Sequence, residues 1–216
     1  MDNWQIFLSL GIIALLIYAN TDSEYNDLPE LIPKNLNKVS VNNYPHFDDN
    51  NLTYAFSDSC IGPTIPKTKL AFEIISNNTE RKLNFTEIPY GIKPDIIINC
   101  NSGKEFAEGG GFYLGEGGPS SYYQDSKVIV YSELNFYSVT NTTSTQSCYS
   151  LPVVEIHEIL HALGIDHHEG GYDIMSKQFD MFTCKYVTKM NEKYSDCLKA
   201  IYSNVKSECE GVNFLF

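Results

Sequence analysis

Basic residues are scarce in this sequence. Its 216 residues include 15 lysines and arginines against 27 aspartates and glutamates, so the formal net charge is −12. Nucleic acids and anionic membrane surfaces are negatively charged and repel such a chain, so we expect neither as a partner. The length suits one domain, and 43% hydrophobic residues suffice for a buried core, so we predict a monomer with one folded domain.

No hydrophobic run reaches the roughly 20 residues that a membrane-spanning helix needs. The longest, IFLSLGIIALLIYA at residues 6–19, has the length of a signal-peptide core, and a short membrane anchor is the alternative. Acidic residues follow it, and this asymmetry favours export of the rest of the chain. Residues 1–19 are therefore predicted to be a signal peptide or membrane anchor. The remainder is expected to be secreted or anchored on the outer face of the cytoplasmic membrane.

Closely spaced cysteine pairs are also missing. None of the six cysteines stands in a CxxC pair of the kind that zinc knuckles and redox sites use. Their even number favours disulfide bonds in an oxidising compartment, although the sequence does not choose the pairing. Four N-x-Ser/Thr sequons fit a glycosylated exterior protein. The cysteines are Cys60, Cys100, Cys148, Cys184, Cys197 and Cys209, and the sequons begin at Asn51, Asn77, Asn84 and Asn141.

The order of the expected elements indicates an α+β domain. Residues 20–50 are polar and hold three prolines, which predicts a linker, and the folded domain is expected at 51–216. Apolar residues at helical spacing predict a helix at 67–78 and a C-terminal helix between Val187 and Val205. A glycine-rich irregular segment is expected at 103–118, and strands are predicted at 52–56, 83–88, 94–100 and 127–131. This order is typical of a mixed sheet with helices packed on it.

Histidine is rare, and four of the five histidines lie in one stretch, VVEIHEILHALGIDHHEGGYDIMS, at residues 153–176. A helix is predicted from Pro152, which suits a first helical turn, to Gly164, which can adopt the left-handed conformation that ends helices. Within it, His157 and His161 are four residues apart. Their imidazoles therefore project from one face of the helix and can bind one metal ion.

The residues around this pair indicate what the metal does. Glu158 lies next to His157, where its carboxylate can reach a water molecule on the metal without binding the metal itself. Beyond the helix end, His167 can return to provide a third nitrogen. Three nitrogen ligands and one open position are typical of a catalytic zinc site, whereas a structural site is closed by four protein ligands. The sequence thus predicts one zinc ion bound by His157, His161 and His167, with Glu158 as the general base.

The string HEILHALGIDH followed by DIMS resembles the metzincin metallopeptidases, and their matrixin branch most closely, over roughly residues 52–176. The resemblance implies a metzincin-like α+β domain with a twisted, mixed, five-stranded sheet, an active-site helix and a C-terminal helix. It implies a zinc endopeptidase that hydrolyses extended protein or peptide substrates. It also implies that Met175 forms a turn beneath the metal and is not a ligand.

One further implication concerns the glycine-rich segment GGGFYLGEGGPSSYY at residues 109–123. By likeness to matrixins, this segment contains an edge strand that holds the substrate by backbone hydrogen bonds. A floppy loop, or calcium binding with the help of Glu108 and Glu116, is the alternative use of these residues.

The sequence departs from the matrixin pattern in three respects. No histidine lies between His46 and His157, so the second, structural zinc of animal matrixins is expected to be absent. His168 stands where matrixins usually have serine, and its side chain is expected to point away from the metal. Ser176-Lys177 replaces the usual Tyr-Pro, and no cysteine in residues 20–50 is present to bind the zinc in a latent form.

Two other functions fit the same motif. One is a secreted binding module that keeps zinc for stability, and the other is an amidase that acts on cell-wall peptides, since the same water chemistry serves any amide. A purely structural zinc site has no use for the carboxylate of Glu158. Its presence favours the enzyme.

Overall fold

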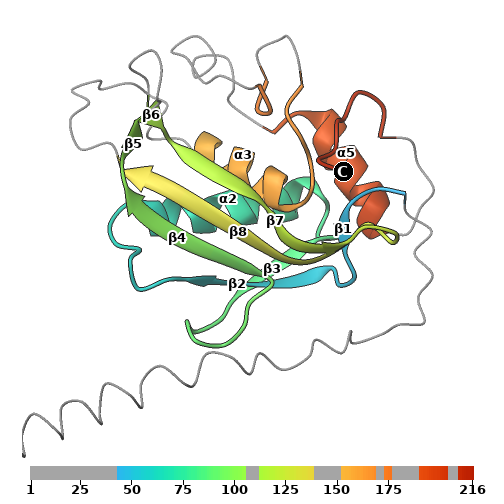
Figure 1. The fold of residues 1–216 in the computed structure, drawn as a ribbon. Coiled ribbons are helices and arrows are strands. Elements are labelled where there is room, and N and C mark those ends of the chain that lie inside the picture. The colour runs from blue at the N-terminus through green and yellow to red at the C-terminus, as the bar shows by residue number, and fades with distance from the viewer. Residues whose placement is uncertain (1–42, 106–111, 139–151, 169–172, 177–189, 204–208) are drawn as a thin grey trace, which may run out of the picture. The chain divides into compact units, whose positions relative to one another are not determined.

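A mixed sheet of six strands lies at the centre of the part of the chain that the structure describes (Figure 1). The structure is a computed structural model, and it describes residues 43–105, 112–138, 152–168, 173–176, 190–203 and 209–216. The predicted signal peptide or anchor and most of the predicted linker lie outside these residues. Among the described residues, no helix combines the length and the apolar character needed to cross a membrane.

The sheet follows the order β1-β8-β4-β2-β3. Strands β1 and β4 pair with different parts of β8, at Val128–Ile129 and at Ser132–Ser138, and β7 pairs with β8 along its opposite edge. The β7–β8 pair is antiparallel, and the other pairs of this sheet are parallel. A separate antiparallel pair is formed by β5 and β6. The strands are β1 (His46–Phe47), β2 (Asn51–Phe56), β3 (Asn84–Glu87), β4 (Ile96–Ser102), β5 (Lys104–Glu105), β6 (Phe112–Tyr113), β7 (Gly115–Tyr123) and β8 (Val128–Ser138).

The predicted α+β architecture with a mixed sheet is confirmed. The four predicted strands correspond to β2, β3, β4 and β8, and the glycine-rich segment contributes β6 and the start of β7. The sheet has six strands instead of five because His46 and Phe47 pair in parallel with Val128 and Ile129. These two residues lie in the range predicted as linker, yet both are buried. A two-residue strand is too short to show alternation in a sequence.

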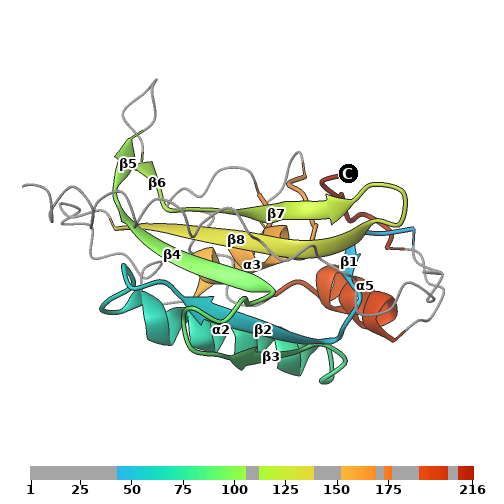
Figure 2. The ribbon, with the colours of Figure 1, turned by 60° about the horizontal axis from the view of Figure 1, so that its bottom comes forward.

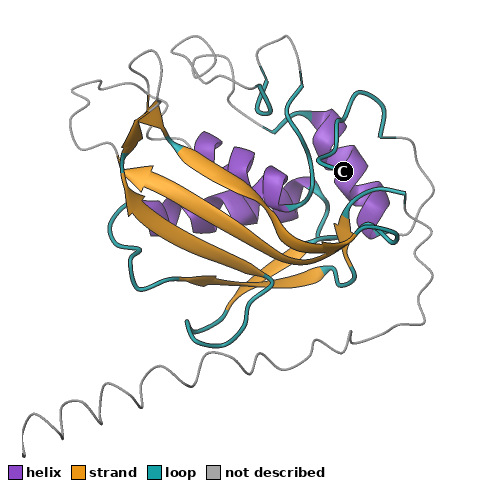
Figure 3. Cartoon of the chain, viewed as in Figure 1, coloured by secondary structure: helices purple, strands orange, loops and turns teal. Residues whose placement is uncertain are grey.

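Three helices of the described residues accompany the sheet (Figure 3): α2 (Thr64–Asn78), α3 (Val153–Ala162) and α5 (Glu192–Tyr202). Figure 2 shows α2 and α3 on one face of the sheet. Helix α2 begins one turn earlier than predicted, because Pro66 lies in the first turn, where a backbone N–H has no helical partner to lose. Helix α3 begins directly after Pro152 and ends just before Gly164, as predicted. Helix α5 is shorter than predicted, and Val187 and Val205 lie outside the described residues.

Alternating residues of the strands supply the core beneath the helices. In β8, Ser132, Leu134 and Phe136 are buried, whereas the residues between them are half-buried. Such alternation places one face of the sheet against α2 and α3, and each fully buried large apolar side chain contributes about 1.5–3 kcal/mol. The buried apolar cluster includes Leu52, Phe72, Ile75, Ile96, Ile98, Leu134, Ile159, Leu160, Met175 and Tyr194.

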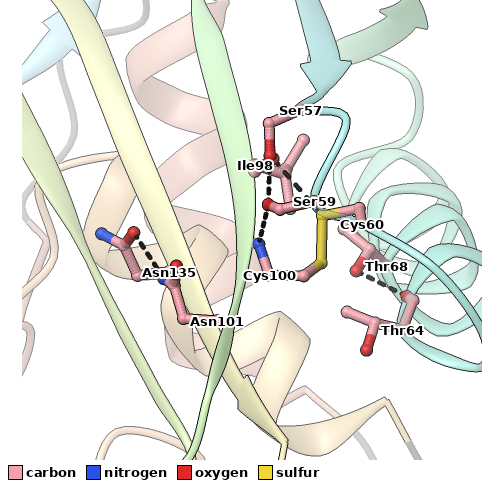
Figure 4. Close-up of a disulfide and its surroundings, with 9 residues drawn as sticks. All are labelled: Ser57, Ser59, Cys60, Thr64, Thr68, Ile98, Cys100, Asn101 and Asn135. Carbon is pink, nitrogen blue, oxygen red and sulfur yellow. Dashed lines mark hydrogen bonds between the residues drawn. A yellow bond between two sulfur atoms is a disulfide. The ribbon is translucent and has the colours of Figure 1, made fainter.

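Two disulfide bonds join segments of the described chain. Cys60, in the loop after β2, is bonded to Cys100 of β4 (Figure 4), where the Cys100 N–H also donates to Ser59 Oγ at 3.2 Å. Cys197 of α5 is bonded to Cys209 near the C-terminus. The predicted use of cysteine in disulfide bonds is confirmed for these four residues. Cys148 and Cys184 lie outside the described residues.

Helix α3 approaches β7 closely because β7 has glycine at alternate positions. A Cβ atom on Gly115 would lie 2.6 Å from Cγ of Glu158, and one on Gly117 would lie 2.4 Å from the Glu158 carbonyl oxygen. Both distances are shorter than van der Waals contact, so a side chain at either position would push the helix away from the strand. A Cβ atom added to Gly118 would meet no atom of α3 and only Leu215 Cδ1, at 4.0 Å.

These distances predict that substitutions at two neighbouring glycines differ in their effect on stability. Gly117→Ala places a methyl group against the backbone of α3 and is expected to lower the free energy of unfolding by about 1–3 kcal/mol. Gly118→Ala has room for its methyl group and serves as the matched control. Urea denaturation of both variants measures the difference, and equal stabilities would show that the close approach of α3 to β7 is not constrained as described.

The disulfide bonds should contribute unequally to stability. Loop closure in the unfolded chain costs more entropy for the sequence separation of 40 in Cys60–Cys100 than for the separation of 12 in Cys197–Cys209. Double serine variants of the first and second pair should lose about 4 and about 3 kcal/mol, respectively. Denaturant titrations of the two variants test this order, and a larger loss from the second pair would contradict it.

Candidate active site

Helix α3 places three polar side chains of the histidine-rich stretch in a buried position. His157, Glu158 and His161 are each only 5–6% exposed. The ring centroids of His157 and His161 are 4.6 Å apart, as expected for residues one helical turn apart. Ser132 of β8 donates its hydroxyl to the carbonyl of Ala162 at 2.7 Å and so fixes the C-terminal end of the helix.

The chain then turns so that His167 returns to this pair. The turn is made at Gly164, whose φ of +89° is in the left-handed region and whose added Cβ would lie 2.4 Å from Pro45 Cβ. Both the conformation and the close approach require glycine here. The segment after the turn is held by the C-terminal residues, because the Asn213 side chain donates to the His167 carbonyl at 2.9 Å.

The three imidazoles meet at one point. The Nε2 atoms of His157, His161 and His167 lie 3.1 Å from one another in all three pairs. Nitrogen ligands of one tetrahedral zinc ion, each at about 2.0–2.1 Å from the metal, are separated by about 3.3 Å. Within the described part of the chain, this is the one group of three or more histidine, cysteine or acidic side chains arranged closely enough to bind a metal.

The other ring nitrogens of the two helical histidines decide which way the lone pairs point. His157 Nδ1 lies 2.5 Å from the carbonyl oxygen of Ile174, and His161 Nδ1 lies 2.7 Å from that of Ile165. A carbonyl accepts only, so each Nδ1 carries the hydrogen and each Nε2 presents its lone pair to the centre. Carbonyl partners of this kind are typical of metal-binding histidines.

Both helical histidines are held in the neutral form that a metal requires. Burial and the neighbouring His161 lower the pKa of His157 to about 3, and burial and the neighbouring His167 lower the pKa of His161 to about 4. Each ring therefore carries only its Nδ1 hydrogen at neutral pH, and its Nε2 atom is not protonated. Two converging lone pairs repel one another unless a cation or a hydrogen lies between them, and with the nearby Nε2 of His167 they form a donor set that fits zinc.

The side chain of Glu158, a residue of α3, points toward β7 and lies against Gly115. Burial, followed by repulsion from the carboxylates of Glu116 and Glu155, raises the pKa of Glu158 to about 8. A divalent cation at the histidines acts in the opposite direction and favours the ionised form. The carboxyl group can therefore exchange a proton near neutral pH, which is the property of a general acid or base.

Met175 is fully buried in the segment 173–176, which follows the histidines. The carbonyl of Ile174 in this segment is the one that accepts from His157 Nδ1. The Met175 side chain is not part of the nitrogen cluster. The segment therefore contacts the site through its backbone.

His168 and His46 lie apart from the cluster. His168 Nε2 lies 2.5 Å from Asp173 Oδ1, so its ring points away from the three nitrogens, as expected. His46 is buried in β1, and its Nδ1 donates to the carbonyl of Tyr44 at 2.8 Å. Of the two acidic residues considered for calcium, Glu116 accepts from the Tyr137 hydroxyl at 2.7 Å and Glu108 lies outside the described residues.

Asp173 is a residue of this site region that sequence reasoning missed. Its carboxylate contacts His168 and, from helix α5, Lys193 and Tyr194. No motif spacing reveals the contacts with helix α5, because Tyr194 lies 21 residues from Asp173 in the sequence and Lys193 directly precedes it. Its position directly before Ile174 and Met175 was the one signal available.

Comparison with known proteins agrees with this geometry. The sequence model of the matrixin family, peptidase M10, matches residues 46–203, which is most of the chain and includes every site residue described above. A search of curated proteins found no match. Given the extent of the family match and the three-histidine site within it, the chain belongs to the matrixin family of peptidases.

Proposed function

We propose that this protein is a zinc-dependent endopeptidase in which His157, His161 and His167 bind one zinc ion and Glu158 is the general base. The observation that carries the proposal is the convergence of three Nε2 atoms, each 3.1 Å from the others. Two of them come from α3, which also bears the buried carboxylate of Glu158, and the third comes from His167 beyond the end of the helix. Membership of the matrixin family supports it. Zinc bound there supplies a Lewis acid that polarises the scissile carbonyl and makes water a stronger nucleophile.

Glu158 carries out the proton transfers. Its carboxylate accepts a proton from the attacking water and then donates this proton to the amine that leaves. The raised pKa of about 8 favours the second step, and the positive charge of the metal favours the first by stabilising the ionised form. A carboxyl group poised between these two influences can perform both steps in one cycle.

The substrate is an extended segment of protein or peptide that lies along β7. This strand pairs with β8 on one side, and no other strand of the described residues pairs with it. Its first residue, Gly115, packs against Glu158, so a peptide added to the free side of β7 passes close to the general base. Backbone hydrogen bonds to an edge strand hold a peptide in the extended form without requiring a particular sequence.

The proposed place of action is outside the cytoplasm, with the protein secreted or anchored on the outer face of the membrane. Two disulfide bonds in the described residues support this, because disulfide bonds persist mainly in oxidising compartments. Export through residues 1–19 accounts for how the chain reaches such a compartment.

Glu158→Gln should separate metal binding from catalysis. The amide retains the size of the carboxyl group but cannot accept the proton, so cleavage should fall by about 100- to 10,000-fold, while the zinc content stays near one ion per chain. Peptide fragments of an unfolded protein are identified by mass spectrometry, and zinc is measured by elemental analysis. Near-native cleavage by the variant would exclude the assigned base.

The same assay separates the other functions. If the unsubstituted protein binds zinc and cleaves neither proteins nor small amides, it is a binding module. If it cleaves cell-wall peptides and leaves unfolded proteins intact, it is an amidase.

His167→Ala and His168→Ser test the third ligand. The His167 substitution removes one of the three converging nitrogens and should abolish or greatly weaken zinc binding, whereas His168→Ser removes a ring that points toward Asp173 and should retain about one zinc per chain at excess zinc. Metal analysis after gel filtration measures both. Loss of zinc from the His168 variant and its retention by the His167 variant would move the ligand assignment by one residue.

A further inference from the structure

The carboxylate of Asp173 accepts hydrogen bonds from several donors at once. It is buried, with 9% of its surface exposed, and it lies at the start of the segment 173–176. Its oxygens accept hydrogen bonds from four groups that come from three parts of the chain. These are His168 Nε2 at 2.5 Å, the Met175 N–H at 2.9 Å, Lys193 Nζ at 2.9 Å and the Tyr194 hydroxyl at 3.1 Å.

The backbone of Asp173 closes the same segment on itself. Its N–H donates to Ser176 Oγ at 3.0 Å, and its carbonyl accepts from the Ser176 N–H at 3.1 Å. The His168 N–H donates to the Met175 carbonyl at 3.3 Å, which ties the segment to the residue after His167. Segment 173–176 is therefore fixed on one side to the chain that bears His167 and on the other to helix α5.

One carbonyl inside this segment reaches the metal site. The Ile174 carbonyl accepts from His157 Nδ1 at 2.5 Å, and Ile174 directly follows Asp173. A shift of the segment would therefore rotate the imidazole of His157 or leave its Nδ1–H without an acceptor. Either change moves the Nε2 lone pair off the point where the other two nitrogens meet.

The charge of Asp173 is suited to this role. Burial raises the pKa of the Asp173 carboxyl, but hydrogen bonds from Lys193, His168 and the Met175 N–H outweigh burial, and the net pKa lies below its usual range. The carboxylate is thus ionised at neutral pH and binds its donors through charge-assisted hydrogen bonds, which are stronger than neutral ones.

We propose that Asp173 is a positioning residue for the metal site, which orients His157 through the Ile174 carbonyl and takes its own position from Lys193 and Tyr194 of helix α5. The proposal rests on the zinc site of the proposed function and does not depend on which substrate is cleaved. It assigns to helix α5 a part in setting metal affinity, although Lys193 and Tyr194 contact none of the three histidines in the hydrogen bonds and ion pairs described above.

Zinc affinity of the full chain is the direct test. Zinc ion alone is the probe, and its affinity is measured by competition with a chromophoric chelator for the unsubstituted protein and for Asp173→Asn. The variant is expected to bind zinc about 10- to 100-fold more weakly, the range found when partners of metal ligands are removed. At saturating zinc, kcat for peptide cleavage should fall with KM little changed, because the substrate lies along β7.

A second pair of variants keeps the test informative if Asp173→Asn does not fold. Lys193→Met removes one of the cations that contact Asp173 and should weaken zinc binding, as Asp173→Asn does. Lys193→Arg keeps the charge and can donate to the same oxygen, so its zinc affinity should be close to that of the unsubstituted protein. Glu87→Gln is the matched control. It breaks an ion pair of similar length, Lys69 to Glu87 at 2.6 Å, on the far edge of the sheet, and should leave zinc affinity unchanged.

General loss of stability is distinguished by the double variant Cys60→Ser/Cys100→Ser. It destabilises the fold at the loop after β2 and at β4 and replaces none of the residues that contact Asp173 or the three histidines, so its zinc affinity should match that of the unsubstituted protein wherever circular dichroism shows both to be folded. The proposal is overturned if Asp173→Asn and Lys193→Met bind zinc as tightly as Glu87→Gln, or if the cysteine variant weakens binding equally. Failure of the unsubstituted protein to cleave peptides would refute the proposed function alone, because zinc affinity is read without a substrate.

Discussion

Three imidazole lone pairs directed at one point are the constraint on which the rest of this structure depends. Such an arrangement is repulsive without a cation, so the fold must hold each ring against its tendency to turn away. Two rings are held by carbonyl acceptors, from Ile174 and Ile165. For the third, the backbone carbonyl of His167 is held by the side chain of Asn213. Helix α3, the turn at Gly164 and segment 173–176 thus each fix one direction, and none of them suffices alone.

Glu158, the proposed general base, takes its position from two glycines of β7 that have no side chain. Gly115 and Gly117 let the backbone of α3 lie against β7, so the edge where a peptide can bind and the carboxylate of Glu158 are held at a fixed separation. A larger residue at either position would widen the gap by the size of its own side chain. The composition of this segment, which suggests a flexible loop when read as sequence, is in the structure a requirement of close packing.

Sequence reasoning succeeded where the information was local. The spacing of His157 and His161 and the end of the helix at Gly164 follow from helical geometry, and the main strands follow from short apolar runs. It failed where distant parts of the chain meet. Strand β1, the pairing of the cysteines and the contacts of Asp173 with helix α5 all depend on tertiary packing that leaves no periodic pattern in the sequence. At residues 115–118 the glycine composition misled for a further reason, because it predicts irregular backbone where the structure has the start of β7. The edge strand expected in this stretch came from the family resemblance alone.

A site built in this way can leave one metal position open. In a small structural zinc site, a fourth protein ligand closes the coordination shell, and the metal itself supplies much of the folding energy. Here two of the three ring orientations come from hydrogen bonds to backbone carbonyls, and the described residues are stabilised by an extensive apolar core and two disulfide bonds. Because the protein supplies this rigidity, the proposed zinc ion would not need a fourth protein ligand to hold it. The remaining position is then free for water and substrate, beside a carboxylate whose pKa is raised toward neutrality.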